Sequence, residues 1–430
     1  MADIHRASQP PSWNFALLSH PRGTTMSPLR PSDLSSWSIR RRARLQVERL
    51  EGRIALTDGA LDASFGPEFG GYARVPSATS TSSQHDSEVR GLAVQPSGKI
   101  VIAYQYPSQG AARLTRFLAN GSIDSSFGVN GTAVVTIGEN PSSGPTDELR
   151  TLLVQPDGKL VLAGTDAGTQ AVHDFAVTRL TVDGELDTTF GGDGRSFTFM
   201  GYGARLESAT LQPDGKIVAV GSAAELSTDT GNQDFAIMRL NTDGSPDSTF
   251  GNPVAPGSNV RTGNERMPMD LYAYGYDEAR SVVIMPGTNS ILVFGFAKEQ
   301  RYGSSYLAAF ARLNPNGSWD SSFAAGGWRY YSHDEVLFDG LYDPSKSVPL
   351  AIQPVSGRVI LGGTVTRPRS TGVPSGPQPA GFRFLDNGDL DTSFGVGGVT
   401  RFDVPTNIGT PTSYLNDLTT TRSSSVARSS

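Results

Sequence analysis

The residues that most obviously could bind a ligand are Gly-Lys pairs, because a glycine followed by lysine occurs in loops that bind phosphate. The pairs are Gly98-Lys99, Gly158-Lys159 and Gly215-Lys216, with Gly357-Arg358 as a related fourth. A phosphate loop also needs a glycine five positions earlier and Ser or Thr directly after the lysine. Here the earlier positions hold Ala93, Leu153 and Thr210, and the next residue is Ile or Leu. The sequence therefore excludes a phosphate loop at these three pairs.

The same pairs belong to a repeated Gln-Pro-x-Gly-Lys motif followed by an apolar run. Its copies lie at 95–101, 155–161, 212–218 and 353–360, with a weaker copy from Met285 to Gly295. Proline presets φ for a turn, and glycine takes a left-handed position before the β-branched run resumes. The motif predicts a tight β-hairpin.

Five arginines each precede an aspartate by eight residues, an arrangement that could bind an anion. The pairs are Arg116/Asp124, Arg179/Asp187, Arg239/Asp247, Arg312/Asp320 and Arg383/Asp391. A single site needs one such pair, so recurrence in every unit favours a structural role over ligand binding. We expect the aspartate to accept backbone N–H bonds in its turn, and the arginine to bridge to it or to the neighbouring unit. A phenylalanine three residues after the aspartate is predicted to fill the core between units, at positions 65, 127, 190, 250, 323 and 394.

Two loops combine aromatic residues with carboxylates, which would suit stacking on sugar rings or docking of a protein segment. We predict these binding residues: Tyr272, Tyr274 and Tyr276 in one loop, and Trp328, Tyr330, Tyr331, His333 and Asp334 in the other. The alternative is that Trp328 and Tyr330 face inward on a strand while the tyrosines pack within their own loop.

Signals for catalysis are few. The chain has no nucleophile elbow, no His-Glu-x-x-His and no calcium loop of EF-hand spacing. It has no cysteine, which excludes disulfides and thiolate metal sites, and only five histidines. We predict no catalytic residue, no metal site and no cofactor.

The repeated motifs must be positioned by strands, and their spacing indicates how. The motif aspartates, counting Asp62 in a partial first copy, recur at intervals of 62, 63, 60, 73 and 71 residues, a period typical of stacked or radial units. Within a unit we expect four strands: one after Phe-Gly, one before Gln-Pro, one after Gly-Lys and one ending in the arginine. Some contain near-continuous apolar runs, as expected for strands covered on both faces. This predicts an all-β β-propeller with blades at about 66–122, 128–185, 191–245, 255–318 and 327–389.

The ends of the chain suggest a sixth, split blade. Residues 53–57 resemble a fourth strand, and 399–404 resemble a first strand. We therefore predict a propeller domain over 45–430, closed by a blade shared between about 45–62 and 395–428. Joining the termini in this way would remove exposed sheet edges.

Together the two motifs resemble the delta-60 repeat, a domain-of-unknown-function β-propeller repeat of bacterial proteins. The resemblance covers roughly 53–405 and implies a propeller without an established reaction. The chain departs from the pattern at Met285, at Arg358 in place of Lys and at Ala324 in place of Gly.

Residues 1–44 are predicted to be a disordered or targeting segment, rich in Ser and Pro over 1–40. Residues 40–56 (RRRARLQVERLEGRIAL) resemble the extracellular-targeting segment of planctomycete proteins, which implies export. The alternative is a short charged helix or a solvated face. If export is correct, Met26 competes with Met1 as the initiator.

The net charge and the variable length of some loops restrict the possible functions. The net charge of −6 argues against nucleic-acid binding, and no apolar run is long enough to span a membrane. Loops of variable length would lie on one face of the propeller, at 76–88, 138–148, 222–234, 263–278, 297–305, 332–347 and 364–380. We therefore expect a monomeric, non-enzymatic, extracellular binding or scaffold module that contacts a protein or glycan through this face. The alternative is a metal-dependent hydrolase or lyase centred on the propeller channel.

An enzyme of that kind needs unlike polar residues on the strands that line the channel. The strands expected there, such as those after Gly131 and Gly398, are mostly apolar or hydroxylated, which favours the binding module.

Overall fold

The structure is a computed structural model. It describes the following residues: 61–66, 70–75, 88–106, 110–138, 147–166, 173–226, 228, 232–251, 258, 261–267, 269, 275–299, 305–324, 326–331, 348–353, 356–366 and 377–401. Residues 63–430 form one compact unit, to which the sheets below belong. The targeting segment predicted within 1–56 lies outside the described residues.

The described residues form five antiparallel sheets of four strands each, so the predicted all-β propeller fold is confirmed. The first two sheets contain β1 (Glu88–Val94), β2 (Ile100–Gln105), β3 (Ala111–Phe117), β4 (Thr132–Thr136), and β5 (Glu148–Val154), β6 (Leu160–Asp166), β7 (Asp174–Leu180), β8 (Arg195–Phe199). The third and fourth contain β9 (Tyr202–Leu211), β10 (Ile217–Ala224), β11 (Gln233–Leu240), β12 (Asn264–Met267), and β13 (Glu278–Ile284), β14 (Ile291–Glu299), β15 (Ser305–Leu313), β16 (Trp328–Tyr331). The fifth contains β17 (Leu350–Ile352), β18 (Val359–Thr366), β19 (Pro377–Phe384) and β20 (Val399–Arg401).

The predicted assignment of strands to blades is wrong by one strand. The strand after each Phe-Gly pairs with the arginine strand before it, as in Thr115↔Thr132 between β3 and β4. It is therefore the fourth strand of its own sheet rather than the first strand of the next. The reason is local: the turn from arginine to Phe-Gly returns the chain directly beside the strand it has just left, as its bond from Asp124 N–H to Arg116 C=O shows.

This shift also corrects the predicted blade count from six to five among the described residues. Residues 399–401, predicted to begin the closing blade, pair with β19 (Phe382↔Val399) and complete the fifth sheet. The remainder of the predicted closing blade, 45–60 and 402–428, lies outside the described residues.

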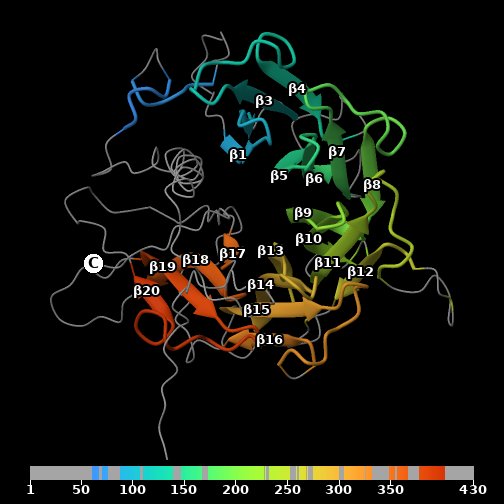
Figure 1. Cartoon of the computed structure of the whole chain (residues 1–430). Coiled ribbons are helices and arrows are strands. Elements are labelled where there is room, and N and C mark those ends of the chain that lie inside the picture. The colour runs from blue at the N-terminus through green and yellow to red at the C-terminus, as the bar shows by residue number, and fades with distance from the viewer. Residues whose placement is uncertain are drawn as a thin grey trace, which may run out of the picture. The chain divides into compact units, whose positions relative to one another are not determined.

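The five sheets follow one another around an axis. The first strand of each sheet contacts the first strand of the next along β1, β5, β9, β13 and β17. Figure 1 shows these strands toward the centre and the fourth strands at the periphery. Apolar side chains pack between neighbouring sheets, and Phe127, Phe190, Phe250 and Phe323 are fully buried. For these four positions, the predicted role as core residues is confirmed.

The antiparallel strand order places two kinds of connection at opposite ends of the strands. The Gln-Pro hairpins and the turns from arginine to Phe-Gly lie at one end, which we call the uniform-turn face. The loops between second and third strands, and those between sheets, lie at the other end, the variable-loop face.

Four of the five arginines form, with their partner aspartates, Arg–Asp clusters that join neighbouring sheets. The fifth, Arg383, contacts Asp391 and Ser393 of its own sheet. Arg179 Nε donates to Asp187 Oδ2 (2.8 Å), its Nη2 donates to Thr189 (3.0 Å), and its Nη1 donates to the backbone oxygen of Thr242 in the next sheet. The guanidinium carbon also lies 4.7 Å from the centre of the Phe190 ring. Arg116, Arg239 and Arg312 make the same set of contacts. These arginines therefore bridge both to the aspartate of their own sheet and to the neighbouring sheet, the two alternatives that the sequence left open.

The ionisation of the aspartate agrees with this structural role. Burial opposes ionisation of Asp187, but hydrogen bonds from Thr189 and Lys159 and the charge of Arg179 outweigh it. They hold the pKa of Asp187 well below its usual value. The lysine of the Gln-Pro-x-Gly-Lys motif therefore binds a carboxylate of its own sheet, with Lys159 Nζ 2.9 Å from Asp187 Oδ2.

Candidate functional site

A β-bulge in the first strand of four sheets places a charged residue on the axial side of the propeller. In β1, β5 and β13 the extra residue of the bulge is Arg90, Arg150 and Arg280, because the pairing register shifts across it. In β9 the extra residue is Glu207. Bulges redirect side chains and are frequent next to functional sites. Four consecutive sheets thus carry a charged side chain at the equivalent position of the first strand.

A second charged residue precedes each bulge by two positions and has the opposite sign. These residues are Glu88, Glu148, Arg205 and Glu278. The third sheet is reversed relative to the other three, with arginine first and glutamate in the bulge. We call the eight residues the inner-strand charge network. They lie near the starts of the first strands, at the variable-loop face, because each first strand follows a loop between sheets.

The reversal in the third sheet produces ion pairs between sheets. Arg205 Nη2 lies 3.1 Å from Glu148 Oε2 of the second sheet, and Arg150 lies 3.6 Å from Glu207. On the other side, Arg280 Nη1 lies 3.5 Å from Glu207 Oε2. Within the third sheet, Arg205 Nε lies 2.9 Å from Glu207. Glu207 is therefore the carboxylate shared by three guanidinium groups from three sheets.

The network passes from solvent to the interior as it crosses the sheets. The side chain of Glu88 is exposed, and those of Glu148 and Arg205 are partly exposed. The side chains of Glu207, Glu278 and Arg280 are buried. The network therefore has a solvent-accessible part in the first three sheets and a buried part formed by Glu207 of the third sheet with Glu278 and Arg280 of the fourth.

Burial changes the ionisation of the fourth sheet's carboxylate. Burial, opposed by Arg280 but reinforced by the like charge of Glu207, raises the pKa of Glu278 to about 7 from an ordinary value of 4.5. Tyr276 lies beside this group, and burial together with the Glu278 charge raises its pKa to about 12. The fourth sheet thus holds a carboxyl group that exchanges a proton near neutral pH.

This raised pKa predicts a pH dependence of folding stability. A proton bound more tightly in the folded state stabilises it fully below about pH 4.5, and this stabilisation is lost as the pH rises through 7. We expect Glu278→Gln, which mimics the protonated form, to remove this part of the decline between pH 5 and pH 8. The measurement is the urea midpoint of both proteins at the two pH values. An identical decline in both would contradict the assignment.

The predicted aromatic residues do not all come together among the described residues. Tyr276 lies beside the inner-strand charge network, and its ring meets Tyr306 edge-on at 6.5 Å. Trp328, Tyr330 and Tyr331 lie on β16, the fourth strand of the same sheet, at its peripheral edge. Tyr272, Tyr274, His333 and Asp334 lie outside the described residues.

The three β16 aromatics differ in exposure. Trp328 packs against the core, and Tyr331 is buried and donates its hydroxyl to Gly388 C=O of the next sheet. Tyr330 is exposed and stacks on Trp328, with ring centres 5.6 Å apart. Tyr330 is therefore the most exposed of the three β16 aromatics.

Sequence reasoning missed the inner-strand charge network because it placed the wrong strand on the axis. The strands after Gly131 and Gly398, used to judge the channel, are fourth strands at the periphery. The signal was present as Glu-x-Arg, or its reversal Arg-x-Glu, ending five residues before the Gln-Pro or Met-Pro turn. With the order corrected, unlike polar residues do converge from the axial strands.

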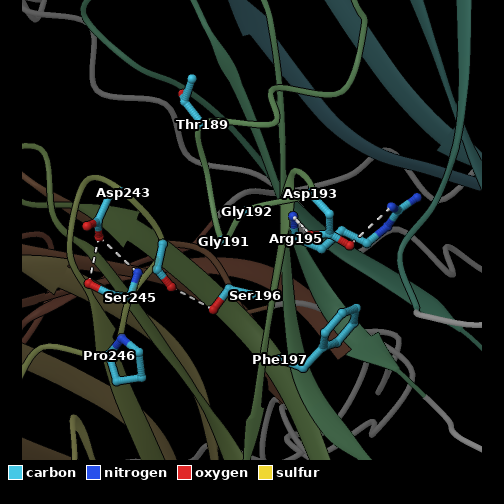
Figure 2. Close-up of a pocket in the computed structure, with 11 residues that line it drawn as sticks. Thr189, Gly191, Gly192, Asp193, Arg195, Ser196, Phe197, Asp243, Ser245 and Pro246 are labelled. Atoms are coloured by element: carbon cyan, nitrogen blue, oxygen red, sulfur yellow. Dashed lines mark hydrogen bonds and ion pairs between the residues drawn. The ribbon is translucent and has the colours of Figure 1, made fainter.

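A pocket on the uniform-turn face is a weaker candidate. It has a volume of about 670 Å³ and lies between turns of the second and third sheets (Figure 2). Its polar groups are engaged within those turns: Asp243 accepts from Ser245, and Ser196 donates to Gly244 C=O at 2.8 Å. Asp193 likewise accepts from the Arg195 backbone. These groups shape the turns, so we favour the inner-strand charge network as the site.

The described residues show neither a cluster of metal ligands nor a membrane-spanning helix. No three His, Asp or Glu side chains in that part of the chain lie together as metal ligands would. None of the described segments is a helix of the length and apolar character needed to cross a membrane.

Comparison with known proteins agrees with the fold. Four segments match a family model described as "Domain of unknown function (DUF5122) beta-propeller": 95–127, 155–190, 212–250 and 289–323. Each match spans one Gln-Pro hairpin, or in the fourth sheet the residues after it, and the following Arg–Asp turn. No curated protein matches the sequence.

Several solved structures are similar in fold. An α-L-arabinofuranosidase from Fusarium graminearum has 12% identity and a TM-score of 0.44, covering 77% of this chain and 83% of its own. A glucose dehydrogenase has 13% identity and a TM-score of 0.37, covering 74% and 88%. A polysaccharide lyase has 10% identity and a TM-score of 0.38, covering 79% and 76%. This level of similarity concerns the fold and not the ligand.

Proposed function

We propose that the protein is a binding module that recognises a glycan at the axial end of its variable-loop face. The observation that supports this most is the charge network, placed at one level by bulges in four consecutive first strands. Repeated structure alone does not require these charges, since the fifth sheet has Val348 at the bulge position. This supports a role for the charges other than forming the fold of a single sheet.

The chemistry of the accessible part suits a sugar. Arginine donates in a planar fork and carboxylates accept, so neighbouring pairs can bind adjacent hydroxyl groups or a uronate carboxylate. Arg90, Glu148 and Arg205 supply these groups from three sheets, with Tyr276 beside the buried end of the network. The variable loops would complete the contact and set the preference among glycans.

Ligand binding predicts a loss of affinity when an accessible carboxylate of the network is removed. Loss of a charged hydrogen bond costs about 1.5–3 kcal/mol, or roughly tenfold or more in Kd. We expect a glycan that raises the melting temperature of the wild type to bind Glu148→Gln at least about tenfold more weakly. The probes are oligogalacturonate and neutral xylo- and cello-oligosaccharides, measured by calorimetry.

The chain offers a matched control in the same sheet. Asp157 is exposed in the hairpin at the opposite end of β5, on the uniform-turn face. Asp157→Asn should bind as the wild type does. Equal weakening by both substitutions, or no binding of any probe by the wild type, would contradict a glycan site at this position.

A second candidate is a channel-centred hydrolase or lyase acting on the same class of ligand. The observation that favours it is that the buried carboxyl groups of Glu207 and Glu278 are neighbours and that the pKa of Glu278 is raised, since a carboxyl group of raised pKa beside a second one is a common arrangement for acid–base catalysis. It predicts release of new reducing ends from a glycan that binds. If a bound glycan is unchanged after prolonged incubation with the protein, the hydrolase or lyase is contradicted and the binding module is the remaining candidate.

We further propose that the protein is exported, on the resemblance of residues 40–56 to an extracellular-targeting segment. Fractionation of producing cells would test this. Accumulation of the full chain in the cytoplasm would contradict it.

A further inference from the structure

The first sheet presents an apolar face that its counterparts bury. Val89, Leu92 and Val94 of β1 are 63%, 55% and 58% exposed. The equivalent Leu149 and Leu152 of β5 are 0% and 7% exposed, because they pack against the first sheet. The corresponding residues of β9 and β13 are likewise buried or partly buried against the preceding sheet. The β1 face is therefore built to receive a strand layer from a preceding sheet.

The position of that preceding sheet is already occupied in part by residues 63–66 and 70–75. Gly66 N–H donates to Asn120 C=O at 2.7 Å, as Gly128 N–H does to Asp183 C=O and Gly191 N–H does to Asp243 C=O. The Phe65 ring lies against Gly121, as the Phe127 ring lies against Gly184. Each of these contacts joins one sheet's turn to the next sheet.

The likeness extends to the start of an outer strand. A Cβ on Gly66 would meet Tyr72 C=O, just as one on Gly128 would meet Thr132 C=O at the start of β4. Residues 63–66 and 70–75 therefore hold the place of a turn and the start of a fourth strand. A sheet at this position also needs inner strands, which these residues do not supply.

The C-terminal segment has the length and pattern for this role. Residues 402–430 follow β20 and suffice for two strands of the seven-residue length of β5 and β6. Leu415 and Leu418 are three residues apart, the spacing of Val89 and Leu92 and of Leu149 and Leu152. Alignment on these leucines places Asp417 in the position of Gly91.

We propose that residues 414–428 of the same chain pack as axial strands against the exposed β1 face formed by Val89, Leu92 and Val94. The segment adds to the sheet position marked by residues 63–66 and 70–75 and covers three apolar side chains. The competing occupant is the same segment of a second copy, which would give a strand-exchanged dimer. The two differ in whether the contact is made within one chain.

The absence of cysteine from the sequence allows a direct test by disulfide formation. A Cβ on Gly91 would lie 2.6 Å from Leu152 Cβ, so the equivalent pair across the proposed contact is Asp417 and Leu92. Leu92→Cys is combined in turn with Asn416→Cys, Asp417→Cys and Leu418→Cys in the full chain, to allow for register. After mild oxidation, the disulfide is located by mass spectrometry and the oligomeric state by non-reducing electrophoresis.

We expect an intramolecular disulfide in at least one of the three variants, strongest for Asp417→Cys. The matched control combines the same tail cysteines with Val129→Cys, which is 77% exposed in a turn of the first sheet and should keep free thiols. A disulfide only between two chains would assign the face to a second copy and overturn the proposal. Free thiols in all three variants, or equal cross-linking in the control, would also overturn it.

Discussion

Replacement of Arg179 by alanine is expected to lower the free energy of unfolding by about 3 kcal/mol, because removing one partner of a buried ion pair leaves the other uncompensated. Arg179 is buried and contacts Asp187, Thr189 and the Phe190 ring in its own sheet and Thr242 C=O in the next. Its loss breaks the contact between sheets as well as the turn. The measurement is equilibrium unfolding in urea.

Two further variants separate the buried contact from general effects of losing an arginine. Arg195→Ala removes a partly exposed arginine of the same sheet. It lies 4.0 Å from the exposed Asp193 and donates one hydrogen bond to Thr136 of the first sheet (3.2 Å), so its loss should cost only about 1 kcal/mol. Arg179→Lys keeps the charge but not the planar fork, and should fall between the two. Equal effects of Arg179→Ala and Arg195→Ala would show that the Arg–Asp cluster does not join the sheets.

Glu207→Gln is the second substitution with a large expected effect, about 3 kcal/mol of unfolding free energy, because it removes the carboxylate shared by three guanidinium groups. Those groups belong to Arg150, Arg205 and Arg280, from three different sheets. The substitution keeps the volume and one hydrogen-bonding oxygen of the side chain, so the loss measures the charge. It is again measured by urea unfolding at neutral pH.

The pH dependence of stability distinguishes loss of the charge network from a general loss of packing. The charge of Glu207 contributes to the raised pKa of Glu278, so Glu207→Gln should move the Glu278-dependent decline in stability to lower pH. The exposed Glu88, paired with Arg90, provides the control, and Glu88→Gln should change stability by less than about 1 kcal/mol. A Glu207→Gln variant as stable as Glu88→Gln would show that the buried network is not needed to hold the sheets together.

The sequence determined the repeat and the local structure of each unit. Gln-Pro-x-Gly-Lys specifies a hairpin because Pro and Gly restrict the backbone locally, and the Arg–Asp turn is closed by contacts within twelve residues. Recurrence of Arg179 and its counterparts in every unit was enough to predict a structural role, which the burial of Arg116, Arg179 and Arg239 supports. These predictions succeeded because their physical causes lie within a short segment.

The assignment of strands to sheets could not be predicted in the same way. The strand at Thr132 can pair with the arginine strand before it or begin a new sheet, and both choices satisfy the same alternation of apolar residues. The actual pairing with β3 depends on how the turn folds back in three dimensions. Because of this error of one strand, β4 rather than β5 was predicted to line the axis of the propeller.

The candidate site depended on that choice. In the sequence, 59 residues separate Glu148 from Glu207, and 71 separate Glu207 from Glu278. Nothing local indicates that their strands lie side by side. Only the packing of successive sheets brings β5, β9 and β13 together, and only the bulge in each strand turns the charged side chain toward its neighbours. The sequence by itself therefore determined the repeating unit, whereas the tertiary structure decided which residues meet at the axis, because that contact is made between units rather than within one.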